Sequence, residues 1–217
     1  MRKKSGLVRS VIVAVSFAAF ATLFGGCDYY FGTRSKGIIR NYERREQAKG
    51  FAAGKFLAGN AETKGKKLLV INSAGAKTNR YTQVLDNALK EQYGSLIEDE
   101  VKDNSSEGDF IAIKAKDIEE VLARHKDAEV FVFKDTLPED YTKLKIKNIF
   151  LINSGSGDLK QIQKDIKSGK ILGIIFTIKG VRIKSTDKVE SNPEEAFKKR
   201  YILIHKGNVD ANAAYFN

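Results

Sequence analysis

The sequence is poor in the residues on which disulfide, metal and nucleophilic chemistry depend. Its 217 residues include one cysteine, two histidines, two prolines, one methionine and no tryptophan. A single cysteine excludes an intramolecular disulfide. No H-E-x-x-H, G-x-S-x-G or C-x-x-C pattern occurs. No motif places a cysteine or serine beside His125 or His205, so we interpret both as core or edge residues. The inventory argues against an enzyme and indicates neither a metal nor a cofactor.

The first 26 residues have the parts of a secretory signal peptide. Four basic residues stand within the first nine, an apolar stretch covers residues 11–24, and Gly25 and Gly26 follow. A membrane-spanning helix needs about 20 apolar residues, and this stretch is shorter. We interpret residues 1–26 as a signal peptide, with a retained single-pass anchor as the alternative.

Cys27 directly follows the two glycines, and this ending resembles the lipobox of bacterial lipoproteins. In that family the cysteine is lipidated and becomes the mature N-terminus; an unmodified cysteine is the alternative. Leu23 and Phe24 stand where the pattern usually has a single leucine three residues before the cysteine. The resemblance implies that Cys27 holds the protein to membrane lipid. Asp28 resembles a residue that enteric bacteria read as an inner-membrane signal. We therefore expect a lipid-anchored protein of the cell envelope, facing the periplasm or the exterior.

The net charge of +11 and the pI of about 9.5 first suggest nucleic acid as a partner. Export argues against that partner, and the lysines are scattered rather than clustered. Near a lipid anchor, basic residues attract anionic headgroups. A generally solvated basic surface explains the same composition, so we expect no nucleic-acid binding.

Strand and helix patterns alternate at least four times after a tether at residues 27–37. Four apolar runs do not alternate with polar residues, which is typical of strands buried on both faces. These predicted strands are residues 68–73, 130–133, 148–153 and 171–178. We predict that residues 38–217 form one α/β domain with a single doubly wound, mostly parallel, Rossmann-like sheet.

The helices between these strands have recognisable starts and ends. A helix over residues 78–93 ends at Gly94, and another begins at Asp158 and ends at Gly169. Asp117 with Glu120 indicates a capping box that opens a helix whose apolar face includes His125. The remaining predictions are a first helix over residues 38–57, an edge-like strand in "SLIEDEV", a helix in "NPEEAFKK" and a final strand in "RYILIHKGNVD".

The stretch "LVINSAGAKTNRY" at residues 69–81 passes from a strand through a small-residue turn into a helix, as phosphate-binding loops do. Lys77-Thr78 matches the end of a G-x-x-x-x-G-K-[ST] loop, but Ala76 replaces the second glycine and the first is missing. "NSGSGD" at residues 153–158 lacks the third glycine of a dinucleotide fingerprint. We therefore expect neither loop to bind a nucleotide.

Polar residues recur at the carboxyl ends of successive predicted strands. They are Asn72, Ser73, Asp135, Asn153, Ser154 and Thr177. Ligands of open α/β sheets bind at this edge, although polar residues there also cap helices and stabilise turns. Phe110 follows a polar loop and is either a ring for stacking on a ligand or an ordinary core aromatic.

Five stretches together resemble the carboxyl-terminal lobe of bacterial periplasmic sugar-binding proteins of the ribose and galactose kind, over about residues 46–208. The stretches are "GFAAGKFLAGN", "KLLVINSAGAKTNRYTQVLDNALKE", "GDFIAIKAKDIEEVLARHKDAEVFVFKD", "IFLINSGSGDLKQIQKDIKSGKILGIIFT" and "ILIHKGNVD". The resemblance implies a lobe that closes with a second lobe on a sugar and delivers it to an ABC transporter or chemoreceptor. The amino-terminal lobe of that family is missing here.

The resemblance also implies a set of ligand-binding residues. Phe110 matches the stacking aromatic and Asp135 matches the acidic half of an Asn-Asp pair. Four positions depart from the pattern: Lys134 replaces the asparagine, Asn153 an aspartate, Thr177 a frequent glutamine and Tyr81 an arginine. With Asn79, these seven residues are the predicted site. A hydroxyl-binding site loses affinity when its polar partners change, so we expect weak binding.

Two functions fit these observations. The first is an exported, lipid-anchored, non-enzymatic binding protein, a one-lobe derivative that recognises a small polar or sugar-like ligand. An ABC permease, a second copy or a separate chain would cover the open lobe. The second is a membrane-anchored structural or protein-interaction module that kept the fold and lost the ligand.

Overall fold

The structure is a computed structural model that describes residues 35–102, 113–134, 137–152 and 158–217. Four residues of the predicted site and anchor lie outside the described residues: Cys27, Phe110, Asp135 and Asn153. The chain divides after residue 41, and the fold below is that of residues 42–217.

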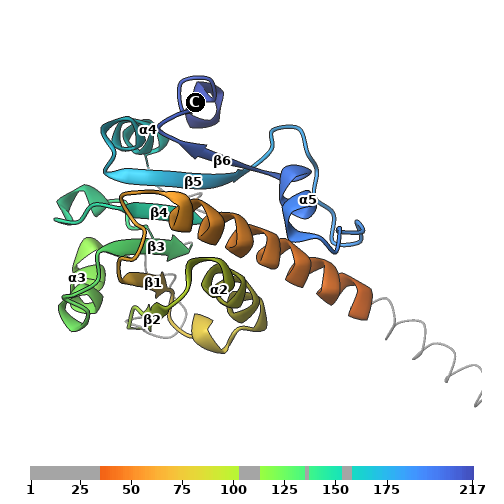
Figure 1. The fold of residues 1–217 in the computed structure, drawn as a ribbon, viewed down its shortest axis with the longest axis horizontal. Helices are drawn as coiled ribbons and strands as arrows, with labels where there is room; N and C mark the ends of the chain where they lie inside the picture. Colours follow the sequence, from red (N-terminus) through yellow and green to blue (C-terminus); the bar gives the residue numbers. More distant parts are fainter. Residues whose placement is uncertain (1–34, 103–112, 135–136, 153–157) are drawn as a thin grey trace, which may run out of the picture. The chain divides into compact units, whose positions relative to one another are not determined.

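A single six-stranded sheet organises this part of the chain (Figure 1). Its order is β2-β1-β3-β4-β5-β6, parallel throughout except that β6 runs antiparallel to β5. The mostly parallel α/β sheet predicted from the buried apolar runs is therefore confirmed. The strands are β1 (Leu68–Asn72), β2 (Leu96–Glu100), β3 (Val130–Lys134), β4 (Ile149–Ile152), β5 (Ile171–Thr177) and β6 (Tyr201–His205).

Helices connect the parallel strands and cover both faces of the sheet. The first helix covers residues 35–59. The others are α2 (Arg80–Tyr93), α3 (Ala115–Arg124), α4 (Leu159–Ser168) and α5 (Pro193–Lys198), with 3-10 turns η1 (Ala76–Thr78), η2 (Tyr141–Lys143) and η3 (Ala213–Phe216). Within the described residues, no helix is both long and apolar enough to cross a membrane.

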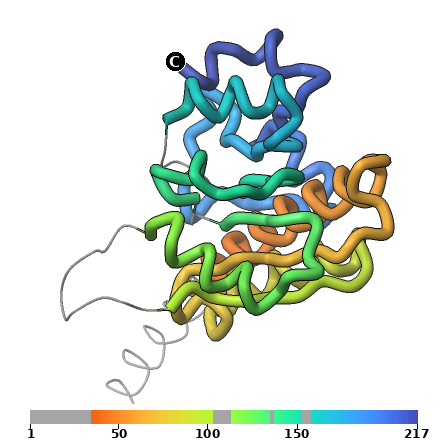
Figure 2. The backbone as a smooth tube through the Cα atoms, turned by 90° about the vertical axis from the view of Figure 1, so that its left-hand side faces the viewer, coloured from red at the N-terminus to blue at the C-terminus, as the bar shows by residue number. Residues whose placement is uncertain are grey.

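The sheet separates two apolar cores, and Figures 1 and 2 show helices on both sides of it. On one face, α3 and α4 bury Ile118, Val121 and Ile162 against the sheet. On the other face, α2 and the part of the first helix after residue 41 bury Leu57 and Leu89. The strands β1, β3 and β4 are wholly buried because helices cover them on both sides.

Two glycines allow the first helix to approach α2 closely. A Cβ atom at Gly50 would lie 2.1 Å from the backbone oxygen of Leu85, and one at Gly54 would lie 2.6 Å from that of Leu89. Both distances are far below contact distance, so only glycine permits this packing. The stretch "GFAAGKF" is thus a helix-packing motif, which places Glu46 near the carboxyl edge of the sheet.

One predicted helix start agrees with the structure and another differs. Asp158 caps α4 as predicted, accepting from the amides of Lys160 and Gln161. The predicted capping box at Asp117 and Glu120 is wrong in register, because α3 begins at Ala115 and Asp117 is its third residue. Asp117 instead accepts from the backbone N–H of Lys114 at 2.9 Å.

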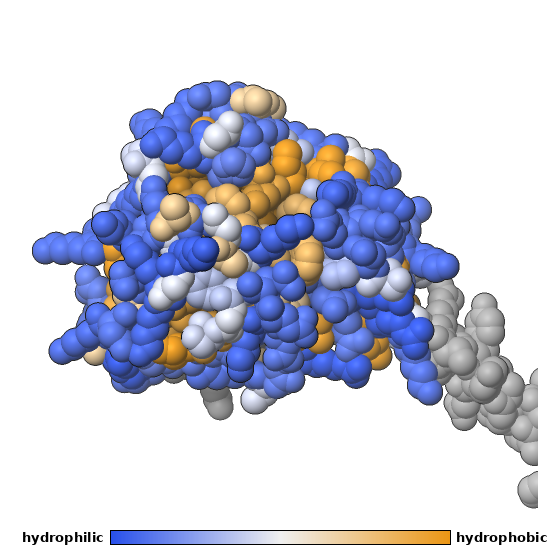
Figure 3. Space-filling model, viewed as in Figure 1, coloured by the Kyte–Doolittle hydropathy of each residue, from blue (hydrophilic) through white to orange (hydrophobic). Residues whose placement is uncertain are grey.

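One part of the sheet is covered less completely than the rest. Figure 3 shows apolar side chains gathered over β5 and β6, beside the first helix. Phe56, Ile183 and Leu203 are partly buried hydrophobic residues on that face. The short helix α5 and the chain between residues 178 and 192 cover this end of the sheet in place of a long crossover helix.

Candidate functional site

A pocket lies at the carboxyl ends of β1 and β3, where ligands of open α/β sheets bind. We call it the apical pocket, and its volume is about 200 Å³. It draws residues from the first helix, β1, the following loop, α2 and β3. They are Glu46, Asn72, Ser73, Ala76, Asn79, Tyr81, Thr82, Leu85 and Lys134.

Asn72 is the most unusual of these residues. It is the last residue of β1 and only 1% exposed, yet neither its side-chain Nδ2 nor its Oδ1 has a hydrogen-bond partner among the described residues. Leaving a buried polar group unpaired costs about 1–3 kcal/mol, and such groups in native proteins call for an explanation. Because Asn72 lines the apical pocket, its amide offers one donor and one acceptor to whatever enters.

Lys134, which lines the pocket, belongs to a buried ion pair. The Nζ of Lys134 lies 2.6 Å from each carboxylate oxygen of Asp86, and the two side chains are 7% and 2% exposed. Burial raises the pKa of the Asp86 carboxyl and lowers the pKa of the Lys134 ammonium, and the attraction between the two charges offsets these shifts only in part. Lys134 is therefore held in place by Asp86 and has little freedom to reach a ligand.

The rim of the pocket carries an amide and a phenol. The Oδ1 of Asn79 caps α2, accepting from the N–H of Tyr81 at 2.9 Å and that of Thr82 at 3.5 Å. The Tyr81 ring lies 5.6 Å from the ring of Tyr42, centroid to centroid. Tyr81 is thereby oriented by an aromatic neighbour, whereas Asn79 serves primarily as a helix cap.

The loop at residues 73–79 is built from its own hydrogen bonds. The Thr78 hydroxyl donates to the Gly75 carbonyl at 2.9 Å, and the Lys77 backbone N–H donates to the Glu100 carboxylate. The Lys77 ammonium lies 3.9 Å from Asp99. Two acidic side chains thus occupy the groups that would hold a phosphate, and Asn79 occupies the first amides of α2. This arrangement agrees with the expectation that the loop binds no nucleotide.

The structure places three of the predicted site residues together and one elsewhere. Asn79, Tyr81 and Lys134 all line the apical pocket. Thr177 is exposed at the end of β5, where it pairs with Tyr201 of β6, and it does not line this pocket. The pocket therefore gathers on the β1–β3 side of the edge.

The sequence prediction missed Asp86 and Glu46. Asp86 carries a signal that was visible beforehand: an acidic residue stands between Leu85 and Leu89 on the buried side of a helix, and such a charge requires a buried partner. Glu46 precedes "GFAAGKF" in the first helix and gave no comparable signal. It lines the pocket and its carboxylate pairs with Lys49 at 2.7 Å.

The two histidines have structural partners. The Nε2 of His125 lies 2.7 Å from the Asp99 carboxylate, at the C-cap of α3 rather than on the apolar face predicted for it. The Nδ1 of His205 accepts from the Gly207 N–H at 3.2 Å, and its ring lies 5.4 Å from that of Phe56. Across the part of the chain that the structure describes, no three metal-ligating side chains come together.

Comparison by sequence finds no relative: no protein-family model matches the chain, and no curated protein resembles it significantly. Comparison by structure finds sugar-binding proteins of transport systems. A carbohydrate transporter from Acidothermus cellulolyticus, in complex with myo-inositol, is 15% identical with a TM-score of 0.49, covering 79% of this chain and 60% of that one.

Two further similar structures are also of periplasmic proteins of ABC transporters. A periplasmic ribose ABC transporter protein from Conexibacter woesei is 11% identical with a TM-score of 0.47, covering 78% of this chain and 60% of that one. A periplasmic solute-binding protein from Actinobacillus succinogenes, with bound D-allose, is 10% identical with a TM-score of 0.47, covering 76% and 62%. The chain thus spans about three fifths of the length of these proteins.

Proposed function

We propose that this protein is an exported, lipid-anchored, non-enzymatic binding protein whose apical pocket recognises a small polar, sugar-like ligand. The single observation that carries the proposal is the amide of Asn72, which is 1% exposed, lines that pocket and has no hydrogen-bond partner among the described residues. A hydroxyl group both donates and accepts, so it matches the Nδ2 and Oδ1 of one asparagine.

The surroundings of Asn72 favour a neutral ligand. Lys134 is neutralised by Asp86 at 2.6 Å, and Glu46 by Lys49 at 2.7 Å. The lining therefore presents no unpaired charge among the described residues. A neutral polyol would form hydrogen bonds with the polar groups of the lining. An anion would be repelled by the carboxylate of Glu46, which lines the pocket with Asn72.

The size of the pocket favours weak binding. Its volume of about 200 Å³ is below the 300–1,000 Å³ typical of pockets for drug-sized ligands. A single lobe leaves the mouth of the pocket open to water, so we expect a Kd of ~1 mM, or about −4 kcal/mol. A second copy, a separate chain or an ABC permease covering the open side would strengthen binding.

The proposed location rests on the first 28 residues. The apolar stretch, Gly25-Gly26 and Cys27 support signal-peptide cleavage and lipidation, and Asp28 favours the inner membrane. We place the protein in the cell envelope with residues 27–37 as the tether and with membrane lipid as a partner.

A titration of the exported form, residues 27–217 with Cys27→Ser, tests the proposal. The isotope-labelled protein would be titrated with myo-inositol, D-allose and D-arabinose while amide shifts are followed by NMR. We expect saturable shifts at Asn72, Ser73, Tyr81 and Thr82, which Asn72→Leu abolishes. The control variant Asn212→Leu should show the same sugar-induced shifts as the parent protein, because Asn212 lies outside the pocket.

If no sugar changes the amide shifts, the alternative is favoured: a membrane-anchored interaction module that kept the fold and lost the ligand. Saturable shifts that persist unchanged in Asn72→Leu would instead place the sugar site elsewhere and contradict the role proposed for the apical pocket.

A further inference from the structure

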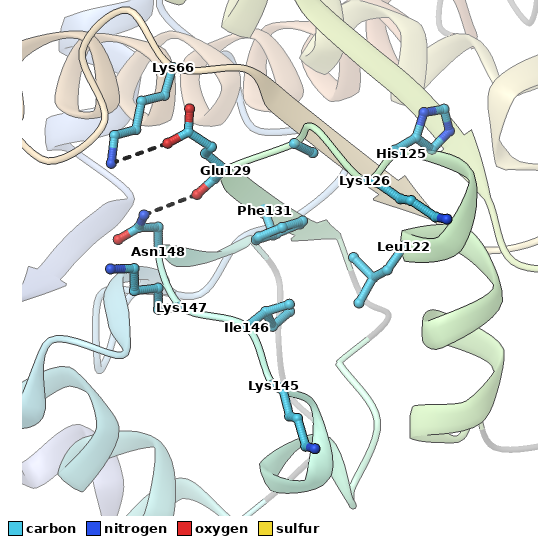
Figure 4. Close-up of a pocket in the computed structure, with 11 residues that line it drawn as sticks. Lys66, Leu122, His125, Lys126, Glu129, Phe131, Lys145, Ile146, Lys147 and Asn148 are labelled. Carbon is cyan, nitrogen blue, oxygen red and sulfur yellow. Dashed lines mark hydrogen bonds and ion pairs between the residues drawn. The ribbon is translucent and has the colours of Figure 1, made fainter.

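A second and larger cavity lies at the opposite edge of the sheet. We call it the basal cleft, and its volume is about 380 Å³, within the range of small-molecule sites. Phe131, near the amino end of β3, and residues 145–148, which lead into β4, form two of its sides. The end of α3 forms the third (Figure 4).

The centre of the basal cleft is apolar. Leu122, Phe131 and Ile146 come from α3, β3 and the loop before β4, and Figure 4 shows their side chains grouped between these elements. Phe131 is 7% exposed, and Leu122 and Ile146 are half-buried. Covering their remaining apolar surface would be favourable by about 25 cal/mol for each Å² removed from water.

The rim of the basal cleft is cationic. Lys126, Lys145 and Lys147 are exposed, and none has an acidic partner within 4 Å among the residues that the structure describes. The fourth lysine of the lining, Lys66, lies 3.6 Å from Glu129, which is the one acidic residue in it. Four lysines against one glutamate leave a strong excess of positive charge.

The loop that carries two of these lysines has a fixed shape. Asn148 has a φ of 60°, in the left-handed region that asparagine tolerates better than most residues. Its side-chain Nδ2 donates to the Glu129 carbonyl at 3.0 Å, and its own carbonyl accepts from the Phe131 N–H at 3.1 Å. The residues before Asn148 are therefore held against β3, with Ile146 on the cleft and Lys145 and Lys147 at its rim.

We propose that the basal cleft binds a small amphipathic anion, an organic phosphate or carboxylate whose apolar body covers Leu122, Phe131 and Ile146 while its charge meets the ammonium of Lys145 or Lys147, and Lys126 adds to the positive charge of the rim. A concave cleft of this size favours a small molecule over an extended chain or a flat membrane. This site is independent of the apical pocket, where the lining charges are paired.

The test uses 1-naphthyl phosphate as the probe, with inorganic phosphate and 1-naphthol as its separate halves. The labelled exported form, residues 27–217 with Cys27→Ser, is first shown to melt cooperatively and is then titrated by NMR. We expect 1-naphthyl phosphate to bind at least about tenfold more tightly than either half, with amide shifts at Leu122, Lys126, Phe131 and Lys147.

Two variants with the same change in net charge separate a site from general attraction to a basic protein. Lys145→Gln with Lys147→Gln should weaken binding by about tenfold. Lys116→Gln with Lys164→Gln, at exposed lysines outside the cleft, should leave it unchanged. Equal weakening in both variants would overturn the proposal, as would equal affinity for inorganic phosphate or no shifts at the cleft. Asn72→Leu should not alter the result, so this test and that of the apical pocket fail separately.

Discussion

The ammonium of Lys134 lies 2.6 Å from both carboxylate oxygens of Asp86, although the two residues are 48 positions apart. Lys134 ends β3 and Asp86 lies on the inner side of α2. Each charge is buried, and each is compensated mainly by the other. Lys134 lines the apical pocket and is held by Asp86, so the integrity of the pair links the stability of the domain to the geometry of the site.

Breaking this pair should destabilise the domain much more than removing it entirely. Asp86→Leu leaves an unpaired buried ammonium and should lower the free energy of unfolding by about 3–5 kcal/mol. Adding Lys134→Met should recover most of that loss, because two apolar residues replace two desolvated charges. Urea unfolding of the two single variants and the double variant measures the coupling. Losses that simply add in the double variant would show that the two charges do not depend on each other.

Asn72→Leu should make the domain more stable, by about 1 kcal/mol, because it removes a buried amide that has no partner in the part of the chain that the structure describes. Asn148→Leu is the matched control, since Asn148 is also buried, at 4% exposed, but donates at 3.0 Å and has a φ of 60°. That substitution should cost about 1–3 kcal/mol. Thermal melts of both variants give the comparison. If Asn72→Leu is as destabilising as Asn148→Leu, the amide of Asn72 has a partner after all.

Low pH should lower the free energy of unfolding of the domain, partly because it protonates the Asp99 carboxylate. Burial disfavours its charge, but hydrogen bonds from Arg124, the Glu100 amide and His125 outweigh burial and lower the pKa of Asp99 to about 2. The folded pKa lies below the ordinary 3.8. The resulting stability, about 1–2 kcal/mol, is therefore complete above pH 5 and is lost as the pH falls through 3.8 toward 2.

Asp99→Asn should remove this part of the acid dependence. Unfolding free energies measured between pH 7 and pH 2.5 should differ most between parent and variant at pH 7, and the difference should shrink toward the acid end. Asp210→Asn, at a side chain 82% exposed, is the control and should change stability little at either end. A constant difference between parent and Asp99→Asn across this range would contradict the prediction.

The loop of residues 73–79 should not bind ATP. Its Lys77 and Thr78 groups are engaged by Glu100, Asp99 and the Gly75 carbonyl. Titrating labelled protein with ATP should therefore give no saturable shifts at Lys77 or Thr78, and neither should Glu100→Gln, since the glycines that admit a phosphate are still missing. Saturation centred on these two residues would overturn this interpretation.

Cys27 should carry the lipid anchor. Export of the full chain in a bacterial host should give a membrane-bound protein that incorporates labelled fatty acid, and Cys27→Ser should abolish both properties without altering the melt of the domain. A matched Ser16→Ala variant keeps the cysteine and should remain membrane-bound. If Cys27→Ser stays with membranes after a carbonate wash, residues 11–24 act as a retained anchor instead.

The sequence by itself determined the layers of the fold. Short apolar runs without alternation, such as residues 68–72 and 149–152, are typical of strands covered on both faces, and both are wholly buried strands. Local signals also gave Asp158 as a helix start and Gly169, with a φ of 86°, as a helix end. These features depend on residues within a few positions of one another, so they can be read along the chain.

Only the tertiary structure decided which distant side chains meet. The order of the strands brings Lys134 to Asp86 and Asp99 to His125, and it leaves Asn72 without a described partner. The same order brings Asn79, Tyr81 and Lys134 to one pocket, while Thr177 lies elsewhere. It also places the end of α3 beside the loop before β4 at the basal cleft. The physical reason is that periodicity reports how deeply a side chain is buried, whereas its partner depends on which strand lies next to its own.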